Sequence, residues 1–551
     1  MKSIITTLVA AVLLWQPCNA KPQSDVKIGK QNITVSNGRM TPEALWAMGR
    51  IGGYAASPDG SKVVYQVGYY SVKHNRSHHV LCCMNADGSG KQLLTKGDNS
   101  ETDGAWLDSE TIAFLTDGEI WTMKTDGSGR QQISKTGGKV EGFKLSPDGK
   151  KAIILKSIPF HEVIKENPQD LPLATGRLVT DLMYRHWDHY VETVQHPFVL
   201  DLQSGRMTDI LEGEPYECPM EPFGGVEQLD WSTDSRQIAY TCRKKTGTAY
   251  SISTDSDIYL YDLATGTTTN LCKPDGYVEP AINPTKTMLH QRVNAAENLK
   301  NNVGYDQNPK FSPDGRYIAW LSMARNGYES DRQRLCCYDR TTGEKHYLTE
   351  TFDSSVDDFC WSDNPKDAQI YFIGVWHATE NLYAINWKGE LKQLTDTWHD
   401  FGSLQMMNNK KQIIAERHCY TAPADLYLIT PNFKKPEKTV ITQITDENKH
   451  ILDQLAKPTV QQRWVKTSDG RQMLTWIVLP PNFDETKKYP TLLFCEGGPQ
   501  SPVSQFWSYR WNFMIMASQG YIVVAPNRRG LPGFGQQWLE QISGDWTGQC
   551  M

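Results

Sequence analysis

Short apolar runs alternate with polar turns along most of the chain, which is the pattern of many short β-strands. Three of the turns read Ser-Pro-Asp-Gly and lead into an apolar run, at 57–60, 146–149 and 312–315. Degenerate copies begin with a tryptophan, at Trp106, Trp231 and Trp361. Proline, aspartate and glycine favour a tight turn between two strands of one sheet. The tryptophan before such a turn is expected to pack between neighbouring sheets.

A second set of glycine-containing turns alternates with the first. These turns lie between the strands that would close each unit, at 85–90, 125–129, 202–205, 263–266, 340–343 and 387–389. Two turn motifs that alternate at roughly forty to fifty residues are typical of four-stranded propeller blades. The pattern predicts a β-propeller over residues 51–450 with about seven blades. Long insertions near 161–189 and 278–306 interrupt the period.

The first residues of the chain do not follow this repeat. Thr41 precedes Pro42, an arrangement that favours the start of a helix. A short helix is therefore expected over 44–50. Residues 21–40 have no clear period and are expected to form a tether, so that 21–50 is read as a tether with a short helix.

After residue 457 the spacing changes again. The expected elements are a hairpin turned at Asp469–Gly470, a buried strand over 490–495, a helical segment over 506–519 and a second strand over 520–526. Strands separated by a helical segment imply an open, largely parallel α/β sheet with crossover connections. The boundary between the two domains is expected at 445–460.

Composition and charge exclude some classes of partner. The 551 residues are 39% apolar and 22% charged, which is usual for a globular protein, and this length predicts at least two domains. The net charge of -6 and the lack of clustered Lys and Arg argue against a nucleic-acid partner. Metal-ligand spacing is not found, and neither a metal nor a cofactor is expected.

The N-terminus has the pattern of an export signal. Lys2 precedes an apolar run over 4–15, and small residues follow it up to Ala20. This predicts a signal peptide over residues 1–20, cleaved after Ala20. Lipid attachment at Cys18 is the alternative. No later stretch is long and apolar enough to span a bilayer, so we expect an exported, periplasmic or extracellular protein.

Twelve cysteines become eleven after such cleavage, and an odd number cannot pair completely. Cys82 and Cys83 are adjacent in a predicted strand, as are Cys336 and Cys337. Neighbouring strand residues face opposite sides, so a disulfide within either pair is not expected.

The last hundred residues also carry a family resemblance. The strand at 490–495, the loop with Gly497 and Gly498, the helical segment, the next strand and the Asn-Arg-Arg-Gly turn at 527–530 together resemble the prolyl oligopeptidase family of serine peptidases. The similarity is to the branch that holds acylaminoacyl peptidases and dipeptidyl-peptidase V. It implies a β-propeller followed by the N-terminal part of an α/β-hydrolase domain, here residues 451–551.

In this family the Gly-Gly-Pro loop lines the oxyanion hole, which implies that role for the backbone of Gly497 and Gly498. Relatives often have His or Tyr immediately before the loop, whereas this chain has Glu496. An ionised carboxylate cannot donate a hydrogen bond, so a side-chain oxyanion role is not carried over to Glu496.

The catalytic triad that the resemblance implies is not found in the sequence. The serine of such a triad lies on a Gly-x-Ser-x-Gly turn, and the acid and the histidine follow it. No such turn occurs, and the last histidine is His450, ahead of the predicted sheet. Two explanations are open: a chain truncated before the nucleophile, and a pseudoenzyme. The chain as given is therefore expected to be inactive.

The resemblance implies a dipeptidyl or acylaminoacyl exopeptidase that acts on short peptides, with the propeller as a size filter and a possible homodimer in the full-length form. Such an enzyme needs carboxylates for the substrate ammonium group, and an arginine or acceptors for its backbone. Candidates on loops are Glu101, Arg185, Asp188 and Glu192. His186 and His189 lie nearby but lack a third metal ligand. The alternative is a propeller that binds a protein or glycan partner without catalysis.

Overall fold

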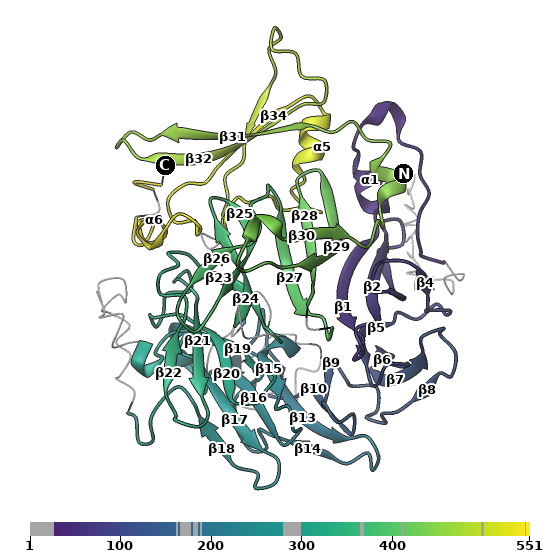
Figure 1. The fold of residues 1–551 in the computed structure, drawn as a ribbon, viewed down its shortest axis with the longest axis vertical. Coiled ribbons are helices and arrows are strands. Elements are labelled where there is room, and N and C mark those ends of the chain that lie inside the picture. Colours follow the sequence, from purple (N-terminus) through teal and green to yellow (C-terminus); the bar gives the residue numbers. More distant parts are fainter. Residues whose placement is uncertain are drawn as a thin grey trace, which may run out of the picture.

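A computed structural model describes the chain from residue 27 onward (Figure 1). The predicted signal peptide, residues 1–20, lies outside the described residues, as do the two predicted insertions for most of their length. The described ranges are 27–160, 164–165, 173, 178–179, 186–187, 190–278, 299–363, 369–409, 411–497, 501–545 and 547–550.

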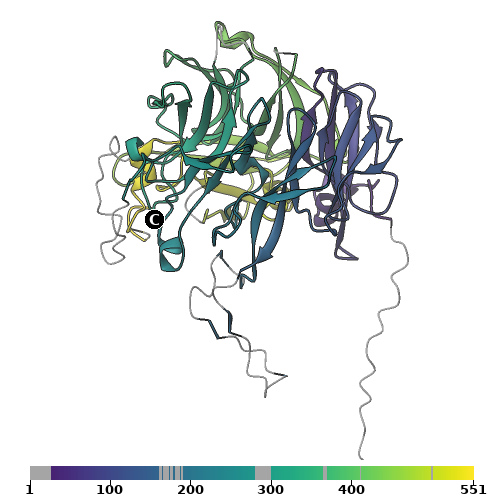
Figure 2. The ribbon, with the colours of Figure 1, turned by 90° about the horizontal axis from the view of Figure 1, so that it is seen from below.

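Small antiparallel sheets form a ring from residue 50 to residue 443 (Figure 2). Within the described residues, five sheets of the ring have four strands each. Their strands are β1 (Arg50–Ala56), β2 (Lys62–Ser71), β3 (Arg76–Asn85) and β4 (Gln92–Leu93); β5 (Thr102–Trp106), β6 (Thr111–Thr116), β7 (Glu119–Lys124) and β8 (Gln131–Gln132); β9 (Gly142–Leu145), β10 (Lys151–Pro159), β13 (Thr193–Asp201) and β14 (Met207–Asp209); β15 (Leu229–Trp231), β16 (Gln237–Cys242), β17 (Asp257–Asp262) and β18 (Thr268–Asn270); β19 (Asp306–Phe311), β20 (Tyr317–Ser322), β21 (Arg334–Asp339) and β22 (Lys345–Tyr347). A two-stranded ribbon, β11 (Ile164–Lys165) and β12 (Leu178–Val179), lies between β10 and β13 in the sequence.

The ring is completed by an eight-stranded sheet that consists of two four-stranded units. A single parallel bridge between Glu380 and Asp400 joins the units. Their strands are β23 (Val356–Trp361), β24 (Ile370–Trp376), β25 (Thr379–Ile385) and β26 (Leu391–Gln393), then β27 (Asp400–Met406), β28 (Ile413–Cys419), β29 (Ala422–Thr430) and β30 (Val440–Gln443).

The predicted turns and tryptophans have the expected roles. In each Ser-Pro-Asp-Gly turn the serine hydroxyl donates to the aspartate at 2.6 Å, and the glycine has φ between +68° and +71°. Each of the three tryptophans donates its indole N–H to a backbone carbonyl of the preceding sheet. The pairs are Trp106 with Ala55 (2.9 Å), Trp231 with Lys144 (3.0 Å) and Trp361 with Lys310 (2.9 Å). The packing predicted for these residues is confirmed.

The structure shows a further repeated contact, which the sequence analysis did not predict. The last strand of most units is followed by an aliphatic residue and then by a hydroxyl residue, whose oxygen accepts a backbone N–H from the third strand. The pairs are Thr95 with Leu81, Ser134 with Ile120, Thr349 with Leu335, Thr395 with Leu382 and Thr445 with Leu426, at 2.7 to 2.9 Å. This contact satisfies a backbone donor that would otherwise be buried without a partner.

The ring closes where its first and last units meet, and Figure 1 shows the purple β1 and β2 beside the green β27 to β29. Tyr54 on β1 donates its hydroxyl to Ile414 O on β28 at 3.3 Å. The backbone N–H of Ala56 donates to Gln405 Oε1 at 3.2 Å. Side chains of the two units share one buried apolar cluster. Non-covalent contacts, and not a continuous strand, therefore hold this junction.

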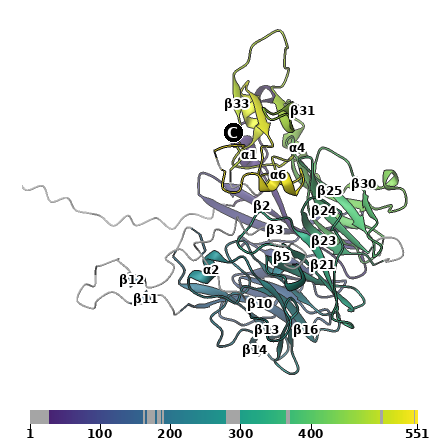
Figure 3. The same cartoon turned by 90° about the vertical axis from the view of Figure 1, so that its left-hand side faces the viewer.

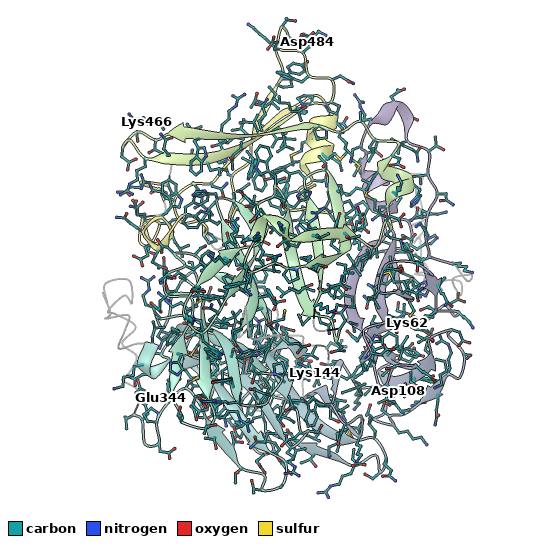
Figure 4. All side chains as sticks on the ribbon, viewed as in Figure 1. Lys62, Asp108, Lys144, Glu344, Lys466 and Asp484 are labelled. Atoms are coloured by element: carbon teal, nitrogen blue, oxygen red, sulfur yellow. The ribbon has the colours of Figure 1, made fainter. Side chains whose placement is uncertain are left out.

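A separate sheet follows the ring, in the order β31-β32-β34-β33. Its strands are β31 (Thr459–Lys466), β32 (Gln472–Leu479), β33 (Thr491–Leu493) and β34 (Ile522–Pro526). The hairpin turned at Asp469–Gly470 is confirmed, and Lys466 marks its tip (Figure 4). The expectation of a largely parallel sheet holds only for β33 and β34, because the hairpin adds two antiparallel pairs.

The described α-helices are short, and the predicted helical segment over 506–519 contains a helix only at its end. The helices are α1 (Pro42–Ala47), α2 (Thr248–Ile252), α4 (Lys449–Leu452), α5 (Phe513–Ser518) and α6 (Gln536–Glu540). Among the described residues no helix has the length and apolar character that crossing a bilayer requires. The eleven cysteines from Cys82 to Cys550 are all free, as expected for the two adjacent pairs.

The N-terminal segment packs against α4 and α5 and not against the ring alone (Figure 3). The N-cap of α1 is confirmed, because Thr41 Oγ1 accepts the Ala44 N–H at 3.2 Å. The expected tether is not loose from Ile33 onward. Gln454 donates to Ile33 O at 3.1 Å and accepts the Val35 N–H at 2.9 Å. The tether was predicted because this segment lacks a period, yet hydrogen bonds to a distant part of the chain fix it.

The tryptophan contacts between sheets lead to a prediction for stability. Trp361→Phe keeps an aromatic ring but removes the indole donor, so the buried Lys310 carbonyl loses a partner. We expect the free energy of unfolding to fall by about 1–3 kcal/mol in denaturant titrations followed by circular dichroism. Trp464→Phe is the matched control, since Trp464 is 43% exposed, and a change within about 0.5 kcal/mol is expected there. Equal losses in the two variants would contradict a role for the hydrogen bond.

Candidate functional site

The loop after β33 lies at the end of the C-terminal sheet. Phe494 continues the pairing of β33, since its N–H donates to Val524 O at 2.9 Å. Arg528 then donates to the Glu496 carbonyl at 2.7 Å, which fixes the start of the loop. A Cβ added to Gly497 would meet no described atom within 4 Å apart from its neighbours in the chain. Gly498 lies outside the described residues, and the oxyanion role of both glycines stays a prediction.

A cavity of about 490 Å³ separates this loop from the ring. The C-terminal part contributes Phe494, Glu496, Ser501, Pro502, Ser504, Phe506, Trp511 and Pro532, and the ring contributes Met323, Glu329, Ser330, Asp331, Gln333, Ser355, Asp357, Val375 and Glu380. The loop therefore faces the ring. This arrangement allows one ligand to contact both parts.

The lining of this cavity is acidic. It contains five carboxylates, and no Lys, Arg or His is among the lining residues that the structure describes. Asp331 is paired with Arg325 at 2.8 Å. The carboxylates of Asp357 and Glu380, which we call the acid wall, accept no hydrogen bond and meet no cation among the described residues. The described residues thus give the acid wall no compensating cation.

Asp400 lies directly beneath the acid wall. It is 1% exposed, and its Oδ1 accepts the Glu380 N–H at 3.1 Å. Its Oδ2 accepts no hydrogen bond from the described residues. The nearest basic group is the imidazole of His418 at 3.9 Å, and burial lowers the pKa of His418 to about 4, which leaves it neutral near pH 7. Asp400 adds a third carboxylate without a counter-cation.

Burial and mutual repulsion hold protons on this group of carboxyls. Burial raises the pKa of Asp400 to about 7. Burial and the charge of Asp400 raise the pKa of Asp357 to about 7 and that of Glu380 well above its ordinary value. Asp357 lines the cavity, and its side chain is exposed there. A bound cation would favour the ionised forms.

Two hairpin turns of the ring insert into the C-terminal part. The turn between β24 and β25 places Ala378 in the C-terminal core with no exposed surface, and His377 N–H donates to Gly533 O at 2.9 Å. The turn after β28 buries Tyr420, whose ring packs against Phe513 with centroids 4.9 Å apart. No described residue bonds the Tyr420 hydroxyl.

Comparison with known proteins identifies the family to which the chain belongs. Residues 507–551 match the Prolyl oligopeptidase family. The chain is 44% identical over 538 residues to the dipeptidyl-peptidase 5 of Porphyromonas gingivalis, a match that covers 95% of this chain and 73% of that protein. The chain belongs to the prolyl oligopeptidase family. The dipeptidyl-peptidase 5 of Porphyromonas endodontalis is 43% identical over 560 residues, covering 100% of this chain and 76% of that protein.

Solved structures agree on the fold of this family member. An acylaminoacyl peptidase of Pyrococcus horikoshii has a TM-score of 0.65 and 17% identity, over 92% of this chain and 69% of its own. An acylaminoacyl peptidase in complex with Z-Gly-Gly-Phe-chloromethyl ketone has a TM-score of 0.63 and 16% identity, over 91% of this chain and 69% of its own. At such identity the likeness concerns the fold, a propeller joined to a hydrolase domain, as predicted.

Of the four residues predicted from loops, the structure describes Glu101 and Glu192, and neither lines this cavity. Glu101 is 5% exposed and forms an ion pair with Arg130, and it accepts the Thr95 hydroxyl at 2.7 Å, so its carboxylate is engaged inside the ring. Glu192 is exposed directly before β13 and is not part of the cavity lining. Arg185 and Asp188 lie outside the described residues. The substrate roles of these four residues stay predictions.

Of the two histidines of the same insertion, the structure describes His186. His186 lies 2.6 Å from a Glu217 oxygen, and His189 is outside the described residues. The residues that the structure describes contain no group of three or more side chains able to hold a metal ion.

Sequence reasoning overlooked the acid wall because it searched loops for charged residues. Asp357 and Glu380 lie within strands, and Asp400 begins a strand. Carboxylates within predicted strands were the available signal, since charged residues are seldom placed inside a protein without a partner.

Tyr420 gives a prediction for the interface. Tyr420→Phe removes only a hydroxyl without a described partner, so the free energy of unfolding should stay constant or rise by about 1 kcal/mol. Tyr420→Ala leaves a cavity among aromatic rings and should lower it by about 3–5 kcal/mol. Denaturant titrations of both variants measure the difference. If the phenylalanine variant is as unstable as the alanine variant, the hydroxyl and not the ring carries the interaction.

The raised pKa values give a prediction for pH. A carboxyl with a folded pKa of about 7 and an unfolded pKa of about 4 stabilises the folded chain at low pH, and this contribution is lost as pH rises from about 4 to about 7. Asp357→Asn should therefore raise thermal stability more at pH 8 than at pH 5. Glu437→Gln, at an exposed carboxylate outside the cavity, should leave that difference unchanged. An equal effect of Asp357→Asn at both pH values would contradict the assignment.

Proposed function

We propose that this chain forms the peptide-binding part of an exported serine-type dipeptidyl peptidase. In this proposal residues 51–450 are a propeller of about seven blades, and residues 451–551 are the start of the hydrolase domain. The observation that carries the proposal is the acid wall, which faces the Glu496–Gly497 loop across the cavity and lacks a cation among the described residues. A free amino terminus is the cation that the proposal assigns to it.

The chemistry of the cavity favours a free amino terminus over a blocked one. An ammonium group donates three hydrogen bonds and carries a positive charge, so carboxylates are its natural partners. An acylated terminus has no charge and would leave the acid wall uncompensated. This difference favours dipeptidyl over acylaminoacyl activity. The cavity volume of about 490 Å³ falls in the usual range for small ligands, about 300–1,000 Å³.

The names of the similar proteins support the same activity class, since both relatives from Porphyromonas are named dipeptidyl-peptidase 5. In this family the nucleophile and its histidine follow the oxyanion loop. The 551 residues contain neither a Gly-x-Ser-x-Gly turn nor a histidine after His450. The proposal therefore assigns peptide binding, and not turnover, to these residues by themselves.

The second candidate function is a propeller that binds a protein or glycan partner without catalysis. Its support is the ring itself, because propellers serve many functions. It predicts that residues 458–551 can be removed without loss of the partner. A homodimer of the full-length protein is part of the first proposal.

The first proposal predicts selective binding of free amino termini. Isothermal titration at pH 8 should show alanyl-alanine amide binding, with at least about tenfold weaker affinity for its N-acetyl form and for the Asp357→Asn and Glu380→Gln variants. Glu437→Gln is the matched control and should bind as the unaltered chain does. No release of chromophore from an alanyl-alanine nitroanilide is expected.

Equal affinity for the free and the acetylated amide would overturn the assignment of the acid wall. Turnover by the 551 residues would overturn the inference that they lack the working nucleophile.

A further inference from the structure

Another cavity, of about 590 Å³, lies between the unit of the ring that ends in β22 and the unit that ends in β26. Its wall includes Tyr317, at the start of β20, and Trp387, in the turn between β25 and β26. We call these two residues the aromatic pair, since their ring centroids lie 4.6 Å apart. Figure 4 labels Glu344, in the turn that leads into β22, toward the opposite end of the molecule from Lys466. The cavity is therefore separate from the acid wall.

Tyr317 occupies a position that is polar in the other units of the ring. Its carbonyl accepts the N–H of Ser312, which begins the preceding turn. The residues whose carbonyls make the same bond at the other turns are Lys62, Thr111, Lys151, Gln237, Gln369 and Gln412. The ring therefore forms elsewhere without an aromatic side chain at this position.

Trp387 also departs from the repeat. In its turn the Asn386 carbonyl accepts the Gly389 N–H at 3.0 Å, and Asn386 Oδ1 accepts the Lys388 N–H at 2.9 Å. The residues at the same place in the corresponding turns are Ala86, Thr125, Leu202, Leu263 and Arg340. Two of them are leucines, so an aliphatic side chain is sufficient for packing here. Trp387 is instead 39% exposed and lines the cavity.

The protein holds the aromatic pair in place from behind. The ring of Trp361, which is 5% exposed, lies 6.2 Å from that of Tyr317 and 6.3 Å from that of Trp387. The Arg316 guanidinium lies over the Tyr317 ring at 4.9 Å and pairs with Asp339 at 2.7 Å. A side chain of the protein thus already supplies the cation that an aromatic ring can attract.

The charged groups in the lining of this cavity are balanced. Two carboxylates, Asp339 and Glu350, are matched by two lysines, Lys345 and Lys388, and His346 adds an imidazole. These groups include both donors and acceptors of hydrogen bonds. The lining therefore differs from the acidic cavity at the acid wall, and it suits a neutral ligand that both donates and accepts hydrogen bonds.

We infer that this cavity binds a neutral oligosaccharide, with one sugar ring against Trp387. A sugar ring has a face of C–H groups, which packs on an aromatic ring, and hydroxyl groups at its edge, which donate and accept hydrogen bonds. The volume of about 590 Å³ falls in the usual range for small ligands, about 300–1,000 Å³. This inference goes beyond the proposed binding of peptides and does not depend on it.

Titration followed by saturation-transfer NMR tests the inference with three probes, maltotriose, cellotriose and chitotriose. At least one of them should bind the unaltered chain with a dissociation constant below about 10 mM. Trp387→Leu should weaken that binding at least about tenfold, because the aromatic face is lost. The variant should still fold, as thermal unfolding would show, since leucine occupies the same place in two other turns. Trp464→Leu is the matched control, because Trp464 is 43% exposed outside the cavity, and its binding should be unchanged.

Failure of this inference is distinct from failure of the proposed function. Trp387→Leu should bind alanyl-alanine amide as the unaltered chain does, so the two sites are measured separately. If none of the three saccharides binds, or if Trp387→Leu binds them as tightly as the unaltered chain, the inference is wrong. Binding of phenylalanine amide in place of the saccharides would assign the cavity to a side chain of a protein partner and would also overturn it.

A second variant covers the case in which Trp387→Leu does not fold. Tyr317→Gln introduces the residue that three other units have at this position, at Gln237, Gln369 and Gln412. A loss of saccharide binding of at least about tenfold in this variant would support the inference, since the aromatic pair is broken. Unchanged binding would overturn it.

Discussion

A carboxylate withdrawn from water is unfavourable unless a cation or several donors replace its hydration. In this chain Asp357, Glu380 and Asp400 meet at the junction of the ring and the C-terminal sheet, and the described residues give them one backbone donor and no cation. Two features of the structure reduce the unfavourable free energy of placing these carboxylates together. Raised pKa values keep protons on the group, and packed turns on either side hold it in place.

Much of the fold followed from local sequence. Ser-Pro-Asp-Gly predicts a turn because its hydrogen bonds form between residues close together in the sequence, and the tryptophan of the degenerate turns predicts contact with a neighbouring sheet. The hairpin at Asp469–Gly470 and the cap at Thr41 are local in the same sense. These features need no knowledge of the rest of the chain.

The candidate site could not be obtained in the same way. Its carboxylates come from three different strands, and they approach one another only because β25 and β27 pair through a single bridge. Glu101 was predicted to bind substrate because of its place before a strand. In the structure its carboxylate forms an ion pair with Arg130 and accepts a hydrogen bond from Thr95 within the ring. The tether was misjudged for a related reason, since Gln454, more than four hundred positions away, supplies its hydrogen bonds. In each of these cases the structure depends on interactions between residues far apart in the sequence, which a local pattern does not reveal.

The two inserted turns limit how a ligand can enter the cavity. Ala378 and Tyr420 belong to turns of the ring but are buried in the apolar core of the C-terminal part. These two contacts hold the ring and the C-terminal part together. Separating the ring from the C-terminal part at these turns would expose aromatic surface to water, which is unfavourable. A ligand that enters the cavity must therefore do so while these two contacts stay in place.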